Sequence, residues 1–448
     1  MRFLIVGMFL MILAACGSEE AAVQQSVAAP QAEASITGSA LIEPGRIDSA
    51  LSRFVETGEL LGVSALVFEG GVEAYFGAFG MADREAGRSI DRDTLVQIFS
   101  MTKPLTGVAL MTLYEQGLFE LDDPLEKHLP EYSGIQVYTG EENGEVLLKA
   151  PARAPTIRDI MRHTAGFTNG DDSDQTWVGN RYREVDPGNI RNTLEQMSVK
   201  LASVPLLFEP GTRWYYGPSV DVQARLVEVL SGEPFQDVLQ KRVLDPLDMT
   251  QTQYTLRADQ REHMTGLYRR QADGSFTRIS DDDALGFNLN DWPMKPGSWG
   301  LTSTLDDYMR FARMLLNGGE LDGARILQPE TVSLMATDAM PASVVDKSWL
   351  PNKGHVGFGI DFAVRTAPPV DQAAGSGAVG EFFWDGAANT LFWVDPKNDI
   401  AAVLFNYYLP FGKVEIMKDF RDAIYYHDEE ASALNKAPPG PDSRRLSD

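Results

Sequence analysis

The chain has 448 residues, of which 44% are hydrophobic and 23% charged, so it has the length and composition of a globular protein with a large buried core. Its formal net charge of -25 argues against binding to nucleic acid or to an anionic membrane surface, because either would repel it unless a basic patch compensated, and the sequence shows no such patch. Its glycines and prolines are scattered without a period, which excludes a fibrous or repeat architecture.

The first residues, MRFLIVGMFLMILAAC, have the layout of an export signal. Arg2 precedes an apolar run that is shorter than the roughly 20 residues of a membrane-spanning helix. The segment LAAC resembles the bacterial lipobox, which implies a signal peptide over residues 1–16 and lipid attachment to Cys16. Cys16 is the only cysteine, so no intramolecular disulfide is possible. An ordinary secretory signal is the alternative.

A lipid at Cys16 would place the protein in the bacterial cell envelope, on the periplasmic side. By resemblance to lipoprotein sorting rules, Gly17 favours the outer membrane. Residues 17–43 are rich in Ala, Gln, Ser and Glu, which predicts a flexible tether, and residues 431–448 have the composition of a disordered tail. The folded body is therefore predicted over residues 44–430.

Two stretches near the ends of this body predict β-hairpins. Residues 63–80 form two β-branched and aromatic runs joined at Gly70 and Gly71. TLFWVDPKNDIAAVLFNYY, which begins at Thr390, repeats the pattern around a loop at residues 395–399. Hairpins at both ends predict one antiparallel sheet flanked by helices, an α+β fold.

Between the hairpins the apolar spacing becomes helical. Helices are predicted after Lys103 up to Gly117, from a capping box at Thr156 and Asp159, over residues 220–232, and from Leu305. The sequence therefore predicts a sheet part over residues 44–97 and 291–430, interrupted by a mainly helical part over residues 98–290.

Ser100 and Lys103 lie in the stretch IFSMTKPLTG, at the predicted start of a helix. Residues at i and i+3 share a helix face, and Pro104 is tolerated in the first turn, where its missing N–H costs nothing. A lysine can remove the serine proton when desolvation lowers its pKa. The SxxK spacing alone is weak evidence, since it occurs by chance in chains of this length.

Four further segments accompany this motif in order. They are HTAG at 163–166, EPGTRWYYGPSVDV at 209–222, SWGLTST at 298–304 and WDGAANTLFWVDP at 384–396. Together with SMTK at 100–103 they resemble the serine β-lactamase-related hydrolases, which include class C β-lactamases, penicillin-binding D,D-peptidases and, as the nearest group, family VIII carboxylesterases. The resemblance covers about residues 48–425 and implies the β-lactamase/transpeptidase-like fold.

The resemblance also implies roles for particular residues. Ser100 would be the nucleophile, with Lys103 and Tyr216 as its proton-transfer partners, and which of the two is the base stays open. The backbone N–H groups of Ser100 and Ala387 would form the oxyanion hole, worth about 3 to 4 kcal/mol per donor. Trp384, Asp385 and Gly386 occupy the third motif, expected on an edge strand, and would contact substrate.

Two departures from the family pattern bear on the substrate. Pro218 stands where the second motif often has Asn, and the third motif has Asp385 and no cation. Because recognition of a substrate carboxylate usually needs a positive donor, these residues favour a neutral ester of a small carboxylic acid. A D,D-peptidase or β-lactamase acting on cell-wall peptides or β-lactams is the alternative, and a non-catalytic binding lipoprotein is a further one.

Other constellations are weaker. No GxSxG elbow is present, and His163 is interpreted as a residue that closes a helix and shapes the site. The acidic loops at 170–174 and 280–284 lack the ligand spacing of a calcium loop. No metal or cofactor is therefore expected. The predicted partner is a small-molecule ester, with no nucleic acid and with membrane contact only through the lipid at Cys16.

Overall fold

The computed structural model describes residues 42–171, 174–369 and 376–425. The predicted signal peptide, Cys16, nearly all of the predicted tether and the tail lie outside the described residues. All described residues belong to one compact unit. Among them, no helix combines the length and apolarity needed to cross a membrane.

One eight-stranded antiparallel sheet organises the fold. Strands from the two ends of the chain meet at its centre, where Ser64 pairs with Phe405 and Glu69 with Ile400. Both predicted hairpins and the α+β class are thus confirmed. The strands, in spatial order, are β12 (Val356–Phe358), β13 (Ala363–Arg365), β14 (Phe382–Gly386), β15 (Thr390–Asp395), β16 (Ile400–Phe405), β1 (Gly62–Glu69), β2 (Val72–Asp83) and β3 (Arg88–Ser89).

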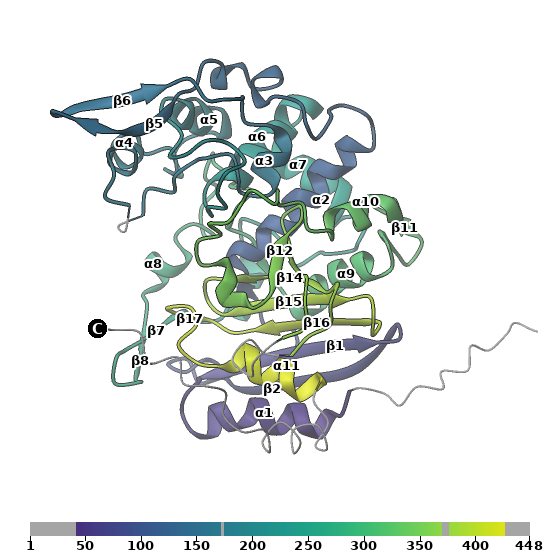
Figure 1. Ribbon diagram of the computed structural model, residues 1–448. Helices are drawn as coiled ribbons and strands as arrows, with labels where there is room; N and C mark the ends of the chain where they lie inside the picture. Colours follow the sequence, from purple (N-terminus) through teal and green to yellow (C-terminus); the bar gives the residue numbers. More distant parts are fainter. Residues whose placement is uncertain (1–41, 172–173, 370–375, 426–448) are drawn as a thin grey trace, which may run out of the picture. The chain divides into compact units, whose positions relative to one another are not determined.

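Helices cover both faces of this sheet (Figure 1). Helix α1 (Pro44–Glu56) packs on β2 and on α11 (Ile416–Tyr425), whereas α9 (Leu305–Leu316) packs on β1, β15 and β16. Because both faces are covered, every residue of β15 and β16 is buried. The sequences of these central strands accordingly contain continuous apolar runs, Leu391–Val394 in β15 and Ile400–Phe405 in β16.

The helical part surrounds a deeply buried helix, α2 (Thr102–Tyr114), which packs against α6 (Ser219–Ser231). All residues of α2 except Tyr114 are buried, so its few polar side chains face other protein groups instead of water. The remaining helices of this part are α3 (Ile157–Met161), α4 (Trp177–Val185), α5 (Leu194–Ala202), α7 (Phe235–Leu239) and α8 (Asp281–Leu285).

The predicted helix boundaries agree with the structure. Thr156 and Asp159 form the capping box of α3, and α6 ends at Gly232 in the left-handed conformation. Thr304 caps α9 by accepting from the N–H of Asp307. Such boundaries can be predicted from sequence because short polar side chains form hydrogen bonds with nearby backbone groups.

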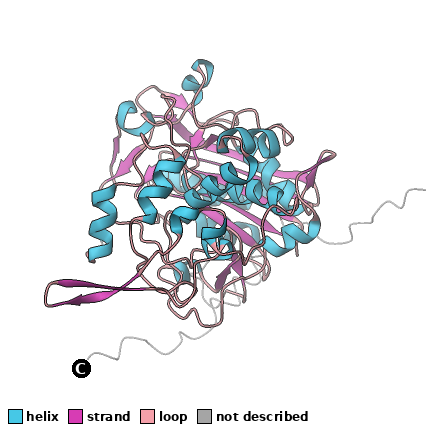
Figure 2. Cartoon of the chain, turned by 90° about the horizontal axis from the view of Figure 1, so that it is seen from above, coloured by secondary structure: helices cyan, strands magenta, loops and turns pink. Residues whose placement is uncertain are grey.

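Strands also occur inside the range predicted as mainly helical. β5 (Val137–Glu142) and β6 (Glu145–Lys149) form a hairpin that extends away from the helices (Figure 2). β7 (Tyr268–Arg270) pairs with β8 (Phe276–Arg278) and, in parallel, with β17 (Tyr408–Leu409). Residues 268–278 therefore associate with the C-terminal segment. Strands this short give too little sequence signal to predict such a long-range pairing.

The other elements are short. They are β4 (Val96–Gln97), β9 (Thr302–Ser303), β10 (Glu320–Leu321), β11 (Ala324–Arg325), α10 (Pro329–Met335), the π-helical turn η4 (Gln240–Leu244) and the 3-10 turns η1 (Phe99–Met101), η2 (Leu125–Lys127), η3 (Pro130–Tyr132), η5 (Ala258–His263) and η6 (Leu350–Lys353).

Candidate active site

Ser100 lies on a tight turn that leads directly into α2. The 3-10 turn η1 precedes the helix, and Phe99 adopts a positive φ of 45°. That region is unfavourable for a bulky residue and persists only where the surrounding structure enforces it. As predicted, the helix begins beside Ser100, and Pro104 falls in its first turn.

Three predicted residues converge at this turn. Lys103 Nζ lies 3.2 Å from Ser100 Oγ and donates to the Ser298 carbonyl at 2.7 Å. Tyr216 lines the same cavity as Ser100 and interacts with its side chain, and the Tyr216 ring centroid lies 4.5 Å from Lys103 Nζ. Trp384 Nε1 donates to the Tyr216 hydroxyl at 3.3 Å. Ser100 is therefore within proton-transfer reach of both an amine and a phenol.

Burial sets the protonation of this pair. Desolvation lowers the pKa of Lys103 to about 8, although Asp221, Asp361 and Asp385 oppose the shift. Desolvation raises the pKa of Tyr216, although hydrogen bonds from Ser100 and Trp384 oppose it. Near neutral pH the phenol is therefore protonated, while a fraction of the lysine is a neutral amine.

The sequence reasoning missed two buried carboxyl groups near Lys103. Asp221 of α6 accepts the Ser298 N–H at 2.9 Å, and burial raises its pKa. Asp361 accepts from Gln223 Nε2 at 3.1 Å, and burial raises its pKa well above the usual range. Asp221 lies within the segment 209–222 that contains Tyr216, so the sequence could have indicated it. Asp361 lies in none of the motifs.

His163 ends α3 and packs behind the catalytic tyrosine candidate, as predicted. Its φ is 58°, and its ring lies 4.8 Å from that of Tyr216 and contacts Trp214 and Phe358. Neither ring nitrogen has a hydrogen-bond partner among the described residues. Burial, with a contribution from Lys103, lowers the pKa of His163 well below 6.5, so the ring is neutral.

The third motif lies on β14. The sequence predicted an edge strand here, but β14 lies inside the sheet, between β13 and β15. β14 pairs with β15 along its length, but β13 is short and pairs only with Phe382 and Phe383. The segment Trp384–Gly386 therefore lacks a β13 partner, which leaves its backbone open on the side where an edge was expected.

Gly386 matters for close packing. A Cβ there would collide with the carbonyl oxygen of Ile98 and with the Thr390 hydroxyl. Only a glycine lets the end of β14 rest directly on the segment that carries Ser100. That contact brings Ala387 into the same cavity as Ser100.

This cavity has a volume of about 360 Å³. Its lining residues are Ser100, Tyr216, Trp349, Asn352, Lys353, Trp384, Asp385, Ala387 and Phe411. Trp214 does not line this cavity and instead stacks behind Tyr216, with ring centroids 6.0 Å apart.

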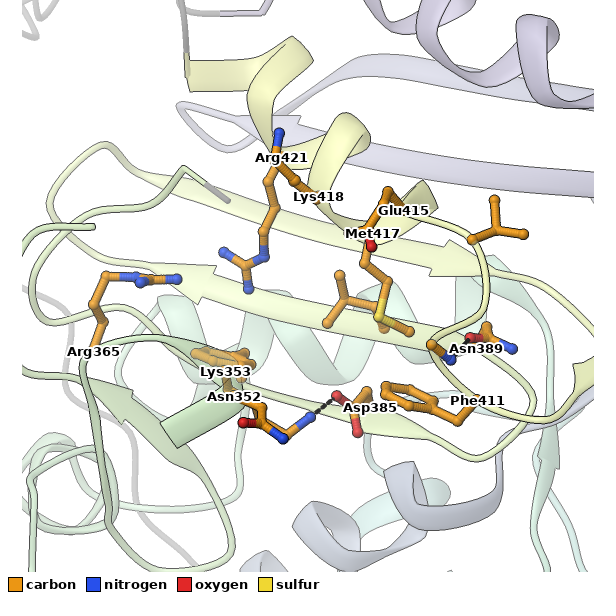
Figure 3. A pocket seen from close by; sticks show the side chains of 14 residues that line it. Asn352, Lys353, Arg365, Asp385, Asn389, Phe411, Glu415, Met417, Lys418 and Arg421 are labelled. Atoms are coloured by element: carbon orange, nitrogen blue, oxygen red, sulfur yellow. Dashed lines mark hydrogen bonds and ion pairs between the residues drawn. The ribbon is translucent and has the colours of Figure 1, made fainter. Parts of the chain in front are cut away.

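The cavity contains a cation that the third motif itself lacks. Lys353, at the end of η6, forms an ion pair with Asp385 (Figure 3). Their side chains are only 10% and 12% exposed, so each charge compensates the other. Lys353 lies in no motif of the sequence, which is why the reasoning from the motif alone did not find it.

Comparisons with known proteins agree with this geometry. The model of the Beta-lactamase family matches residues 47–422. Protein Rv1367c of Mycobacterium tuberculosis is 32% identical over 362 residues, 79% of this chain and 87% of that protein. Lovastatin esterase of Penicillium rubens is 29% identical over 335 residues, 69% of this chain and 79% of that protein.

Among solved structures, that of EstCE1, described as a hydrolase with promiscuous acyltransferase activity, has a TM-score of 0.71 and 25% identity. The match covers 85% of this chain and 98% of EstCE1. Simvastatin synthase of Aspergillus terreus has a TM-score of 0.72 at 22% identity over 85% of this chain and 97% of its own, which speaks for the fold. The chain belongs to the β-lactamase family and is a serine hydrolase.

Proposed function

We propose that this chain hydrolyses neutral esters of small carboxylic acids through an acyl-enzyme on Ser100. The observation that carries the proposal is that the Ser100 hydroxyl contacts both Lys103 and Tyr216 in a buried site. The names of two relatives, lovastatin esterase and the Burkholderia gladioli esterase EstB, support an ester substrate.

The first step uses the neutral amine of Lys103 as the base. It takes the Ser100 proton while Oγ bonds to the ester carbonyl carbon, and the carbonyl π electrons move to oxygen. The lysine is a better base than the tyrosine here because burial favours both its neutral form and the protonated phenol. The backbone N–H groups of Ser100 and Ala387 would stabilise the oxyanion by about 3 kcal/mol each.

The second step expels the alcohol. The oxyanion collapses, the bond to the leaving oxygen breaks, and the Tyr216 phenol gives that oxygen a proton and recovers one from Lys103. Trp384 Nε1 fixes the orientation of the phenol through its 3.3 Å hydrogen bond. Water then attacks the acyl-enzyme with the same groups in reverse, which releases the acid.

The cavity favours a neutral, partly apolar substrate. Trp349, Trp384 and Phe411 supply aromatic walls, and Lys353 is already neutralised by Asp385. A substrate carboxylate would have to compete with Asp385 for that lysine. We therefore expect β-lactams and peptide C-termini to be hydrolysed less efficiently than neutral esters.

The test compares a series of p-nitrophenyl esters with nitrocefin and a D-Ala-D-Ala peptide. We expect short-chain esters to give the highest kcat/KM, and mass spectrometry of quenched reactions to find the acyl group on Ser100. Lys103→Ala and Tyr216→Phe should each reduce turnover by about 10³-fold while circular dichroism stays unchanged. Faster cleavage of nitrocefin or the peptide, or near-wild-type turnover in either variant, would refute the proposal.

We also propose that a lipid on Cys16 anchors the enzyme on the periplasmic side of the envelope, on the basis of the LAAC sequence. Cys16→Ala should move the protein from the membrane fraction to the soluble fraction. Retention of this variant in the membrane fraction would contradict the anchor.

A further inference from the structure

A second cavity, of about 400 Å³, adjoins the active-site cavity. The two share the lining residues Asn352, Lys353, Asp385 and Phe411. The ion pair of Lys353 and Asp385 therefore belongs to both cavities (Figure 3). The second cavity contains none of Ser100, Tyr216 and Trp384, so it is a separate binding volume.

Two buried arginines line this second cavity. Arg365, at the end of β13, is 1% exposed, and Arg421, on α11, is 5% exposed. Both donate to the same carboxylate oxygen of the fully buried Glu381, at 2.9 Å and 2.7 Å. One carboxylate thus compensates two guanidinium groups, which leaves this buried cluster with one excess positive charge.

Each guanidinium also has a donor to spare. Arg365 Nη1 and Arg421 Nη2 are buried and have no hydrogen-bond partner among the described residues. Figure 3 shows both guanidinium groups in the same part of the cavity. A buried charged donor without a partner is costly, and an anion accepting from both groups would remove that cost.

The other charged side chains that line the cavity do not supply an anion for the two arginines. Asp385 is paired with Lys353, Lys418 is paired with Asp422, and Glu415 is exposed to solvent. The apolar part of the lining consists of Phe383, Leu391, Phe411, Val414 and Met417, and the remaining lining residues are Asn352, Asn389 and Gly412.

We propose that this second cavity binds a small carboxylic acid with an apolar body. Its carboxylate would accept hydrogen bonds from Arg365 and Arg421, whose planar groups suit a carboxylate. Its apolar body would lie against Phe383, Leu391 and Met417. A phosphate could use the same donors but would leave the apolar wall uncovered, so the carboxylic acid is the better match.

Calorimetry with hexanoate tests the proposal on the full chain carrying Ser100→Ala, so the result does not depend on hydrolysis. We expect one hexanoate per chain, with hexanamide and inorganic phosphate binding more weakly by about tenfold or more. Met417→Trp fills the cavity without removing a charge and should weaken hexanoate by about tenfold. The matched control, Trp349→Ala, removes a side chain that lines the active-site cavity but not the second cavity, and it should leave the affinity within about twofold.

Arg365→Gln and Arg421→Gln should each weaken hexanoate by about tenfold. If either fails to fold, Met417→Trp decides the matter. The proposal is overturned if hexanoate does not bind, if hexanamide or phosphate binds as tightly, or if affinity is lost in Trp349→Ala and kept in Met417→Trp.

Discussion

At Lys103, burial and three nearby carboxyl groups act on one amine in opposite directions. Burial favours the neutral form, whereas Asp221, Asp361 and Asp385 favour the charged form, and the pKa settles at about 8. A lysine in this range supplies a usable fraction of neutral amine without losing its basicity. The environment of Lys103, more than the SxxK spacing, therefore supports the proposed role of this serine and lysine as a catalytic pair.

This balance predicts a pH dependence. Because the proposed base is the neutral amine, kcat/KM for a p-nitrophenyl ester should rise with pH through about 8. Asp221→Asn removes a group that raises the pKa of Lys103, so the rise should move to lower pH, as measured by pH–rate profiles corrected for background hydrolysis. Asp307→Asn, which changes a carboxyl group that is not among those acting on the pKa of Lys103, is the control and should leave the midpoint in place. A shift to higher pH in Asp221→Asn would contradict the assignment.

A second prediction concerns Asp385. Asp385→Asn should free Lys353 to meet an anionic substrate, so the kcat/KM ratio of a p-nitrophenyl hemisuccinate to a neutral ester should increase by about tenfold. Adding Lys353→Met should cancel the gain. An equal gain in the double variant would show that the lysine is not involved.

At the level of elements, the turn after α3 depends on one buried carboxylate. Asp159 is fully buried and accepts from Arg153, Arg162, Thr164 and the capping residue Thr156. These bonds fix the loop that carries His163 behind Tyr216. The hydrogen bonds and both arginines lower the pKa of Asp159 despite its burial.

Asp159→Asn should therefore lower the free energy of unfolding by about 3 kcal/mol, because two arginines lose their buried partner. Urea denaturation measures the change. Asp122→Asn is the control: its side chain is 73% exposed and bonds Arg158 at the surface, so the loss should stay below about 1 kcal/mol. A loss at Asp159 no larger than at Asp122 would contradict this account.

At the scale of the whole molecule, the sheet joins both ends of the folded chain. β1 pairs with β16, and α1 packs on α11. The helical part inserts between these segments and meets the sheet at η1, the turn before α2, which contacts β14 and β15. Neither end can bury its strands without the other.

This topology predicts that the folded body loses its structure in one cooperative step. Calorimetry should show a single transition, with near-ultraviolet and far-ultraviolet circular dichroism changing at the same temperature. Two resolved transitions would indicate that the helical part unfolds independently of the sheet.

Local chemistry in the sequence determined much of this protein. Runs of β-branched and aromatic residues predicted the two hairpins, caps at Thr156 and Gly232 marked helix boundaries, and the ordered motifs predicted the meeting of Ser100, Lys103 and Tyr216. Each of these signals depends on neighbouring residues or on a resemblance that spans the folded body, so it can be recognised without the tertiary structure.

Only the tertiary structure decided the rest. Lys353 meets Asp385, Asp361 approaches Lys103, and Arg365 and Arg421 share Glu381, although none of these contacts follows a motif. The short β13 likewise leaves Trp384–Gly386 without a β13 partner. Such contacts join residues distant along the chain, and their charges and pKa values depend on burial, which a linear sequence does not specify.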